Sequence, residues 1–141
     1  MDFYIVGLGN PGEQYADTRH NVGWDVLDHC IEEWQLPGLI ADRNLSGQIT
    51  DGTVLDKQVA VLYPSTFMNN SGTAVAKLVA KEDAQKLIVV HDDIDLPIGE
   101  VRVSRGRGDG GNNGVRSIID KLDSKDFTRV RVGIAPRSLL T

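Results

Sequence analysis

Apolar and polar positions follow two periods along the chain, and these periods predict strands and helices in turn. An apolar run over 3–8 predicts a first strand, which ends at the turn residues Gly9-Asn10-Pro11-Gly12. Apolar residues at helical spacing then predict a helix from about 21 to 35, which Pro37-Gly38 stops. The chain therefore begins with a strand, a polar loop and a helix.

The middle of the chain predicts a pair of strands and a second helix. β-Rich segments lie near 45–51 and 57–63, and a turn around Asp51-Gly52 is expected to join them. Asn70 or Ser71 can then cap a helix that carries its apolar side chains on one face. This pattern places two paired strands before the second helix.

The last third predicts three strands and a helix. The continuous apolar run 87–90 is typical of a strand buried on both faces. Residues 100–104 alternate, and the glycine-rich segment 105–111 that follows is expected to be a mobile loop. Asn113 is expected to cap a helix with an apolar stripe, and a last strand spans 127–134.

This order of elements predicts a single α/β domain over 1–141, with a mixed, mostly parallel, twisted β-sheet and helices on both faces. In such folds, ligands bind outside the carboxyl ends of the strands. The reactive side chains follow strands or lie where loops enter helices: Asn10, His20, Asn69, Asp92 and Asn113. The site is therefore expected at that edge of the sheet.

Composition indicates in which cellular compartment the protein works, but it says little about the function. The N-terminus lacks the basic region of a signal peptide, and no apolar stretch approaches the roughly 18 residues that a membrane span needs. The single cysteine, Cys30, cannot form an internal disulfide, which suits a reducing cytosol. Its apolar neighbours indicate a buried structural thiol, with a reactive thiol as the alternative. A cytoplasmic protein without a membrane segment is expected.

The net charge of −5 argues against a nucleic-acid partner, but the charge is unevenly spread. Residues 1–95 carry six Lys/Arg against fifteen Asp/Glu, whereas residues 96–141 carry nine against five. A basic last third can meet a phosphate backbone locally, or it is an ordinary solvated surface. The candidates for phosphate contacts are Arg102, Arg105, Arg107 and Arg131.

A glycine motif after the first strand raises the possibility of a dinucleotide site. The segment 7–12 satisfies G-x-G-x-x-G. The third glycine should open a helix at once, yet the helical period starts only near Val22. The acidic residue expected about twenty positions later should end a second strand, and here the candidates lie on a helix. The dinucleotide interpretation is therefore rejected.

His20 and Asp92 are candidates for proton transfer. His20 lies where a loop enters a helix, and its reference pKa of about 6.5 leaves it largely neutral at pH 7. A lone histidine is more often structural, but a carboxylate such as Asp92 at a strand's end can fix its tautomer. The acids of 91–95 also fit a divalent metal, although no second acidic cluster is near in sequence. No metal is expected.

Asparagines stand out in the predicted loops and caps. They are Asn10, Asn69, Asn70, Asn112 and Asn113. Capping and turn chemistry explains them, and so do amide donors aimed at a carbonyl oxygen and a water. No serine or cysteine has the setting of a nucleophile, so a His–Asp pair with amide donors indicates direct attack by an activated water.

Five segments together resemble bacterial-type peptidyl-tRNA hydrolase, in order and at family-like spacing. They are GLGNPG at 7–12, TRHNVG at 18–23, TFMN with SG at 66–72, HDDIDLP at 91–97 and GGNNG at 110–114. The resemblance runs from about residue 5 to 134. It implies hydrolysis of the ester between a peptide and the terminal ribose of tRNA, which recycles the tRNA, without metal or cofactor.

The resemblance also implies roles for individual residues. His20 would activate the water as general base, and Asp92 would orient and stabilise it. Asn113 would position water or the oxyanion. The substrate-binding residues would be Asn10, Tyr15, Phe67 and Asn69, together with Asn113. The implied partner is peptidyl-tRNA, and a monomer is expected.

Three features depart from the family pattern. The family usually has histidine where Asn112 stands, its members usually run several tens of residues further than this chain, and many are basic whereas this chain is acidic. A C-terminally short hydrolase-like domain is therefore expected. The alternative is a non-catalytic RNA- or peptide-binding relative that has lost the segment holding the substrate.

Overall fold

The structure is a computed structural model that describes residues 1–9 and 21–136. These residues form an α/β domain around one sheet, with strand order β2-β3-β4-β1-β5-β7-β6. The strands are β1 (Phe3–Gly7), β2 (Ile40–Asp42), β3 (Gly47–Val54), β4 (Lys57–Pro64), β5 (Leu87–Pro97), β6 (Val101–Arg105) and β7 (Thr128–Ala135). The helices are α1 (Val22–Glu33), α2 (Ser71–Leu78) and α3 (Asn113–Leu122), with 3₁₀ helices η3 (Met68–Asn70) and η4 (Lys81–Lys86).

The parallel strands lie at the centre of the sheet. β1 pairs in parallel with β4 and β5, and β5 pairs in parallel with β7. Antiparallel strands flank them, because β3 joins β4 on one side and β6 joins β7 on the other. The predicted mixed α/β sheet is confirmed, and its parallel part carries the apolar runs that burial on both faces requires.

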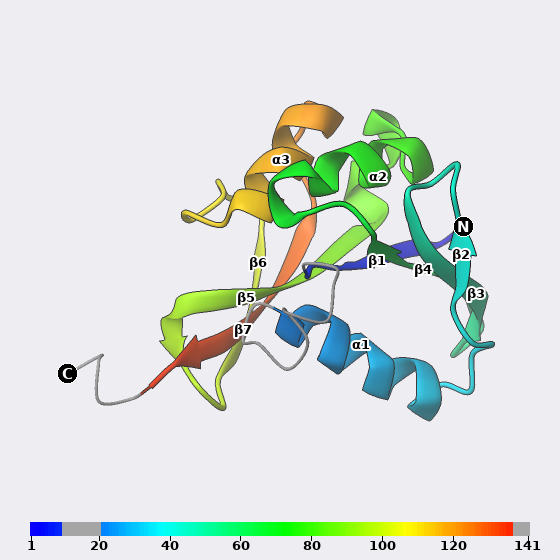
Figure 1. Cartoon of the computed structure of the whole chain (residues 1–141), viewed down its shortest axis with the longest axis horizontal. Helices are drawn as coiled ribbons and strands as arrows, with labels where there is room; N and C mark the ends of the chain where they lie inside the picture. Colours follow the sequence, from blue (N-terminus) through cyan, green and yellow to red (C-terminus); the bar gives the residue numbers. More distant parts are fainter. Residues whose placement is uncertain (10–20, 137–141) are drawn as a thin grey trace.

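Helices cover both faces of the sheet, as expected (Figure 1). On one face α1 packs Leu27 against a cluster that includes Val61 and Val90. On the other face α2 and α3 contribute Val75 and Ile118 to a second cluster around Phe127, Leu62 and Val89. Each cluster takes alternate residues of the central strands, which is the period expected of a pleated sheet.

The packing of α2 on α3 depends on one glycine. A Cβ atom at Gly72 would lie 2.1 Å from the carbonyl oxygen of Ser117. The two helices are further joined by a hydrogen bond of 2.8 Å, which the Gly72 N–H donates to the Ser117 side-chain hydroxyl. This close approach sets the distance between α2 and α3.

The predicted turn at Asp51-Gly52 is wrong, because both residues lie inside β3. The hairpin turns instead at Leu55 and Asp56, which have φ angles of +48° and +68° as a tight two-residue turn requires. Gly52 serves close packing rather than a turn. A Cβ atom there would lie 2.7 Å from a methyl group of Leu36.

The sequence also misplaced the end of β5. The apolar run ends at Val90, but the strand continues to Pro97. Its pairing with β1 stops at Val90, whereas its pairing with β7 continues through Asp93. The polar residues stay in the strand because arginines on β7 bind them. Asp92 therefore lies within β5, just beyond the edge of β1.

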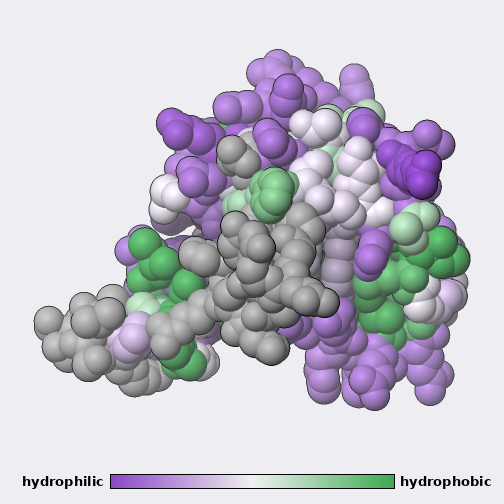
Figure 2. All heavy atoms as spheres, viewed as in Figure 1, coloured by the Kyte–Doolittle hydropathy of each residue, from purple (hydrophilic) through white to green (hydrophobic). Residues whose placement is uncertain are grey.

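On the face shown in Figure 2, hydrophilic residues dominate around α3, the surface over α2 is of intermediate hydropathy, and apolar residues gather near the turn between β5 and β6 and on the opposite side of the view. Exposed apolar side chains of this hairpin are Ile94, Ile98, Val101 and Val103. Among the helices described, none is long and apolar enough to cross a membrane.

Candidate functional site

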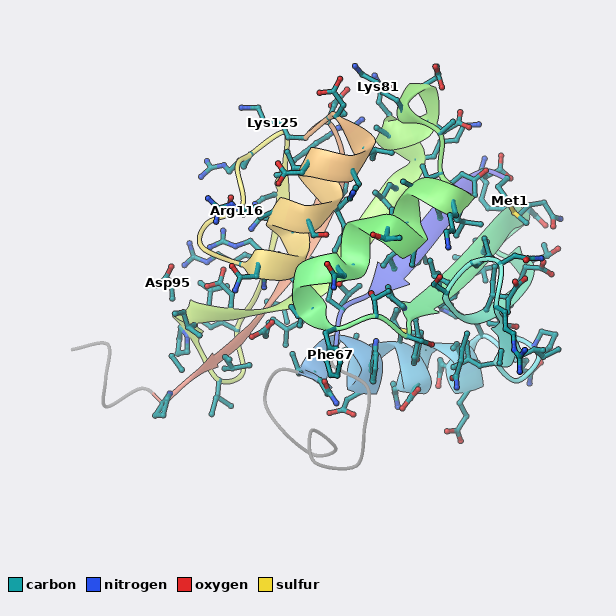
Figure 3. The ribbon with its side chains drawn as sticks, turned by 45° about the horizontal axis from the view of Figure 1, so that its top comes forward. Met1, Phe67, Lys81, Asp95, Arg116 and Lys125 are labelled. Atoms are coloured by element: carbon teal, nitrogen blue, oxygen red, sulfur yellow. The ribbon has the colours of Figure 1, made fainter. Side chains whose placement is uncertain are left out.

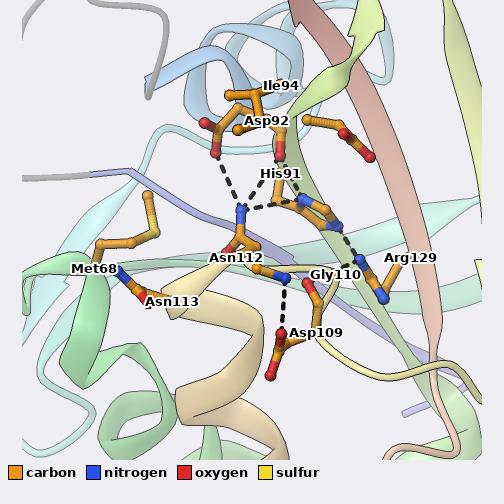
Figure 4. Close-up of a pocket in the computed structure, with 11 residues that line it drawn as sticks. Met68, His91, Asp92, Ile94, Asp109, Gly110, Asn112, Asn113 and Arg129 are labelled. Atoms are coloured by element: carbon orange, nitrogen blue, oxygen red, sulfur yellow. Dashed lines mark hydrogen bonds between the residues drawn. The ribbon is translucent and has the colours of Figure 1, made fainter.

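A pocket lies where β5 extends beyond β1. It is bounded by the end of β5, the loop after β6 and the start of α3 (Figure 4). We call it the β5–α3 pocket. It is lined by Met68, His91, Asp92, Asp93, Ile94, Asp109, Gly110, Gly111, Asn112, Asn113 and Arg129. The edge of the parallel strands is where ligands bind in folds of this class.

Asn112 joins the start of α3 to β5. Its side-chain oxygen accepts a hydrogen bond of 3.0 Å from the N–H of Val115, so it is the N-cap of α3. Its amide nitrogen donates to the carboxylate of Asp92 at 3.3 Å and to the carbonyl oxygen of the same residue at 3.2 Å. The Asn112 side chain thereby holds the start of α3 next to the carboxylate of Asp92.

This arrangement corrects the prediction that Asn113 caps α3. Asn113 is the first residue of the helix, and Asn112 is the cap. The two asparagines are adjacent and equally good capping residues by type, so the sequence alone could not choose between them. Because Asn112 does the capping, the side chain of Asn113 remains a lining residue of the pocket.

His91 is buried beside the pocket, with 1% of its surface exposed. Its Nδ1 lies 2.7 Å from the carbonyl oxygen of Asp92, and its Nε2 lies 3.1 Å from Nε of Arg129. An arginine N–H can only donate, so Nε2 accepts and the ring proton resides on Nδ1. Burial lowers the pKa of His91 and outweighs the hydrogen bond to the Asp92 carbonyl, which raises it, and the positive charge of Arg129 adds to the lowering. His91 is therefore neutral.

Arg129 carries a buried guanidinium group, with 4% of the residue exposed. Besides His91, the group donates to the carbonyl oxygens of Gly108 and Asp109 in the loop between β6 and α3. Burial lowers the pKa of Arg129, and the nearby charge of Arg131 acts in the same direction. The loop that was expected to be mobile is thus bound to β7 through its carbonyl groups.

Arg131 lies on the same face of β7 and binds a carboxylate of β5. Its Nε is 2.7 Å from Oδ2 of Asp93, and its terminal nitrogen Nη1 donates to the Ser104 hydroxyl at 3.2 Å. Burial tends to raise the pKa of Asp93, but hydrogen bonds from the Asp95 N–H and from Arg131 outweigh it and lower that pKa. The two charges form a partly buried ion pair.

Two of the four predicted phosphate-binding arginines share a second pocket. This β6–β7 pocket is lined by Asp93, Asp95, Ser104, Arg107, Gly108, Gly110, Arg129 and Arg131. Arg102 and Arg105 are not among its lining residues. They face carboxylates of Glu100 and Asp126 at 3.8 and 3.6 Å.

The structure places the other predicted site residues unequally. Asp92, 5% exposed, and Asn113 both line the β5–α3 pocket. Phe67 is exposed just before η3, near the N-terminal end of α2 (Figure 3). Asn69 lies in η3, and its side chain is outside the described part of the molecule. Three further residues, Asn10, Tyr15 and His20, are outside the described residues altogether.

Sequence reasoning did not assign roles to His91 and Arg129. His91 was considered as a possible metal ligand, yet both of its ring nitrogens are engaged by protein groups. The signal for Arg129 was a charged residue in an apolar strand, on the same strand face as Arg131. Among the described residues, no group of three or more His, Cys, Asp or Glu is arranged to hold a metal ion.

The family model for peptidyl-tRNA hydrolase matches residues 4–139. A peptidyl-tRNA hydrolase of Thermodesulfovibrio yellowstonii is 44% identical over 134 residues, covering 92% of this chain and 70% of the relative. One from Synechococcus sp. strain JA-3-3Ab is 43% identical, covering 92% of this chain and 58% of the relative. This chain therefore spans 70% and 58% of the length of these two relatives.

Solved structures agree with the sequence comparisons. The crystal structure of peptidyl-tRNA hydrolase from Acinetobacter baumannii superposes with a TM-score of 0.86 at 35% identity. The match covers 95% of this chain and 68% of that chain. At this identity the likeness extends beyond the arrangement of helices and strands.

Proposed function

The chain belongs to the peptidyl-tRNA hydrolase family, and we propose that it hydrolyses the ester between peptide and tRNA in peptidyl-tRNA, recycling the tRNA for translation. The observation that carries this proposal is the joining of Asp92 and Asn113 in one pocket through Asn112. A buried carboxylate can orient a histidine base, and an amide group can hold a water or an oxyanion, which are two of the parts that a water-activating site needs.

In this proposal His20 is the general base. It takes a proton from a water whose oxygen attacks the ester carbonyl carbon, giving a tetrahedral oxyanion. The bond from that carbon to the ribose oxygen then breaks, and the proton on His20 passes to that oxygen. The products are a peptide acid and a tRNA with a free hydroxyl group, without metal or cofactor.

Asp92 would hold the tautomer of His20 and stabilise the imidazolium that forms. The support from the structure is its placement, because Asp92 is almost fully buried and its carboxylate receives the Asn112 amide. Asn113 would position water or the oxyanion from the start of α3. Substrate binding is assigned to Asn10, Tyr15, Phe67, Asn69 and Asn113.

The tRNA would approach over the basic last third of the chain. The β6–β7 pocket adjoins the β5–α3 pocket, since Asp93, Gly110 and Arg129 line both. A phosphate backbone at Arg107 and Arg131 would therefore lie next to the reacting ester. Arg102 and Arg105 remain proposed phosphate contacts at the sheet edge beside it. We further propose that the protein acts as a monomer in the cytoplasm.

The test is release of a blocked amino acid from tRNA by the purified protein in single turnover. We expect turnover well above background, and we expect His20→Ala to lower it by roughly 10²–10⁴. Asp92→Asn should also be severely impaired, because the histidine would lose its orienting carboxylate. Cleavage at full rate by His20→Ala would refute the assignment. Background cleavage by the wild type with retained tRNA affinity would favour the binding-only alternative.

A further inference from the structure

Arg129 makes hydrogen bonds to two segments that lie far apart in the sequence. On the β5 side its Nε donates to Nε2 of His91, whose Nδ1–H in turn donates to the carbonyl oxygen of Asp92. On the other side its terminal nitrogens donate to the carbonyl oxygens of Gly108 and Asp109. One side chain therefore connects the strand that carries Asp92 to the loop that leads into α3.

This connection is energetically unusual for a strand residue. Removing a guanidinium group from water costs several kcal/mol unless an opposite charge compensates it. Within the described residues, no carboxylate lies within 4.0 Å of the Arg129 guanidinium. An apolar residue at this position of β7 would bury surface without that cost. The carboxylates of Asp93 and Asp109 act on the guanidinium from further away, so its direct partners are the neutral ring of His91 and the loop carbonyl groups.

The loop between β6 and α3 is mostly exposed and rich in glycine, so an anchor outside it can restrain its backbone. Gly106, Gly110 and Gly111 have φ angles of +68°, +60° and +86°. Glycine adopts these angles freely, so the backbone is poorly restrained by its local sequence. Asp109 is the point of attachment. Its carbonyl oxygen accepts from Arg129 and from the N–H of Asn112.

We propose that Arg129 is a positioning residue of the ester-cleaving site. Its guanidinium group, bound to His91 on one side and to the loop on the other, sets the distance between Asp92 on β5 and Asn113 at the start of α3. This inference rests on the proposed function. Arg129 does not need to touch the substrate. It acts on Asp92 through the neutral ring of His91, and on Asn113 through the carbonyl groups of the loop.

Two substitutions separate the two ends of this connection. In Arg129→Gln the amide nitrogen follows Cδ as Nε does in arginine, so the bond to His91 is kept and the bonds to the loop are lost. In Arg129→Met both are lost. The matched control is Arg116→Gln, because Arg116 is an exposed residue of α3 (Figure 3) that contacts the Asp109 carboxylate at 3.9 Å from outside.

The first measurement is hydrogen exchange of backbone amides in the free protein. The N–H groups of Gly111 and Asn112 are bonded to Asp109 and report on the loop, while those of 88–90 report on the sheet. We expect Arg129→Gln to speed exchange at the two loop amides by about tenfold or more and to leave the sheet amides unchanged. The Arg116→Gln control should leave both unchanged. Unchanged loop exchange in Arg129→Gln would overturn the proposal.

The second measurement is ester cleavage by the same variants. We expect Arg129→Gln to lower kcat by about 10- to 100-fold, the usual result of misplacing a catalytic group by an ångström. KM should stay within about threefold, because the residue does not bind substrate. Faster loop exchange with an unchanged kcat would also overturn the positioning role. A wild type that cleaves no ester would refute the proposed function alone, since exchange is measured without substrate.

Discussion

The amide nitrogen of Asn112 lies 3.3 Å from the carboxylate of Asp92, while the oxygen of the same amide caps α3 through Val115. An amide group can do both because its nitrogen donates and its oxygen accepts. Asn112 stands where the family usually has histidine, and the sequence left open whether its amide caps a helix or serves as a donor in the site. The structure instead turns its amide toward the protein, which makes it a link between two elements of the pocket.

Substitutions that keep the cap but remove the donor test this link. Asn112→Ser retains a good N-cap oxygen, so α3 should keep its start, and the free energy of unfolding should fall only by the loss of the hydrogen bond to Asp92. The carboxylate of Asp92 loses one N–H donor, and a charge-assisted hydrogen bond contributes about 1.5–3 kcal/mol. We expect kcat/KM for ester cleavage to fall by roughly tenfold. Wild-type kcat/KM in a fully folded Asn112→Ser protein would contradict the link.

Asn112→Asp also keeps the cap but places a second carboxylate beside the first. Two facing carboxylates hold a shared proton more tightly than one does alone. The acid limb of the kcat/KM profile should therefore move to higher pH, whereas it should stay in place for Asn112→Ser. Profiles measured for the two variants under the same buffer conditions separate loss of a donor from gain of a charge.

The sequence predicted the elements of the site better than its connections. The apolar run before His91 indicated a buried strand, and the apolar stripe after Asn113 indicated a helix, because both signals are local. The end of β5 was misjudged because it depends on Arg129 and Arg131, which are distant in sequence. No local pattern could show that a strand arginine binds a loop carbonyl.

The neutral state of His91 predicts how stability depends on pH. Its pKa is lowered in the folded protein, mainly by burial, so the unfolded chain binds a proton more readily. The contribution of His91 to the free energy of unfolding is complete above the pKa of histidine in the unfolded chain, about 6.5. It is lost as the pH falls below that value. The slope from one proton is at most about 1.4 kcal/mol per pH unit.

Urea unfolding of His91→Gln between pH 7.5 and 4.5 checks this slope. A glutamine can still accept from Arg129, and we expect the free energy of unfolding to fall less steeply below about pH 6.5 than in the wild type. His29→Gln, at an exposed position of α1, is the matched control for removing a histidine. Identical slopes for the wild type and His91→Gln would show that His91 is not held neutral by folding.

Gly72→Ala tests the close packing of α2 on α3. Alanine favours a helix over glycine by about 1 kcal/mol, so an exposed position would gain stability. Here the new methyl group meets the Ser117 carbonyl at 2.1 Å, and forcing the helices apart costs about 1–3 kcal/mol or more. We expect a net loss in urea unfolding, whereas Gly38→Ala, which meets nothing within 4 Å, should show no such loss. A stabilised Gly72→Ala would contradict the packing.

The charges of the β6–β7 pocket predict the salt dependence of tRNA binding. Arg107 is exposed there and has no ion-pair partner within 4.0 Å among the described residues, so its charge is available to a phosphate. Arg107→Gln should weaken binding and reduce the magnitude of the slope of log K against log salt by about 1. Arg131→Gln should act similarly but also expose the charge of Asp93, which repels phosphate and adds to the loss.

The matched control for these arginines is Lys57→Gln. Lys57 is an exposed cation at the start of β4, on the acidic part of the chain, and it should leave the slope unchanged. Binding is measured by titrating tRNA at several salt concentrations, because a single affinity does not separate contacts from net charge. If Arg107→Gln and Lys57→Gln lower the affinity equally and leave the slope alone, the effect is one of total charge. The phosphate contact would then have to lie elsewhere on the basic surface.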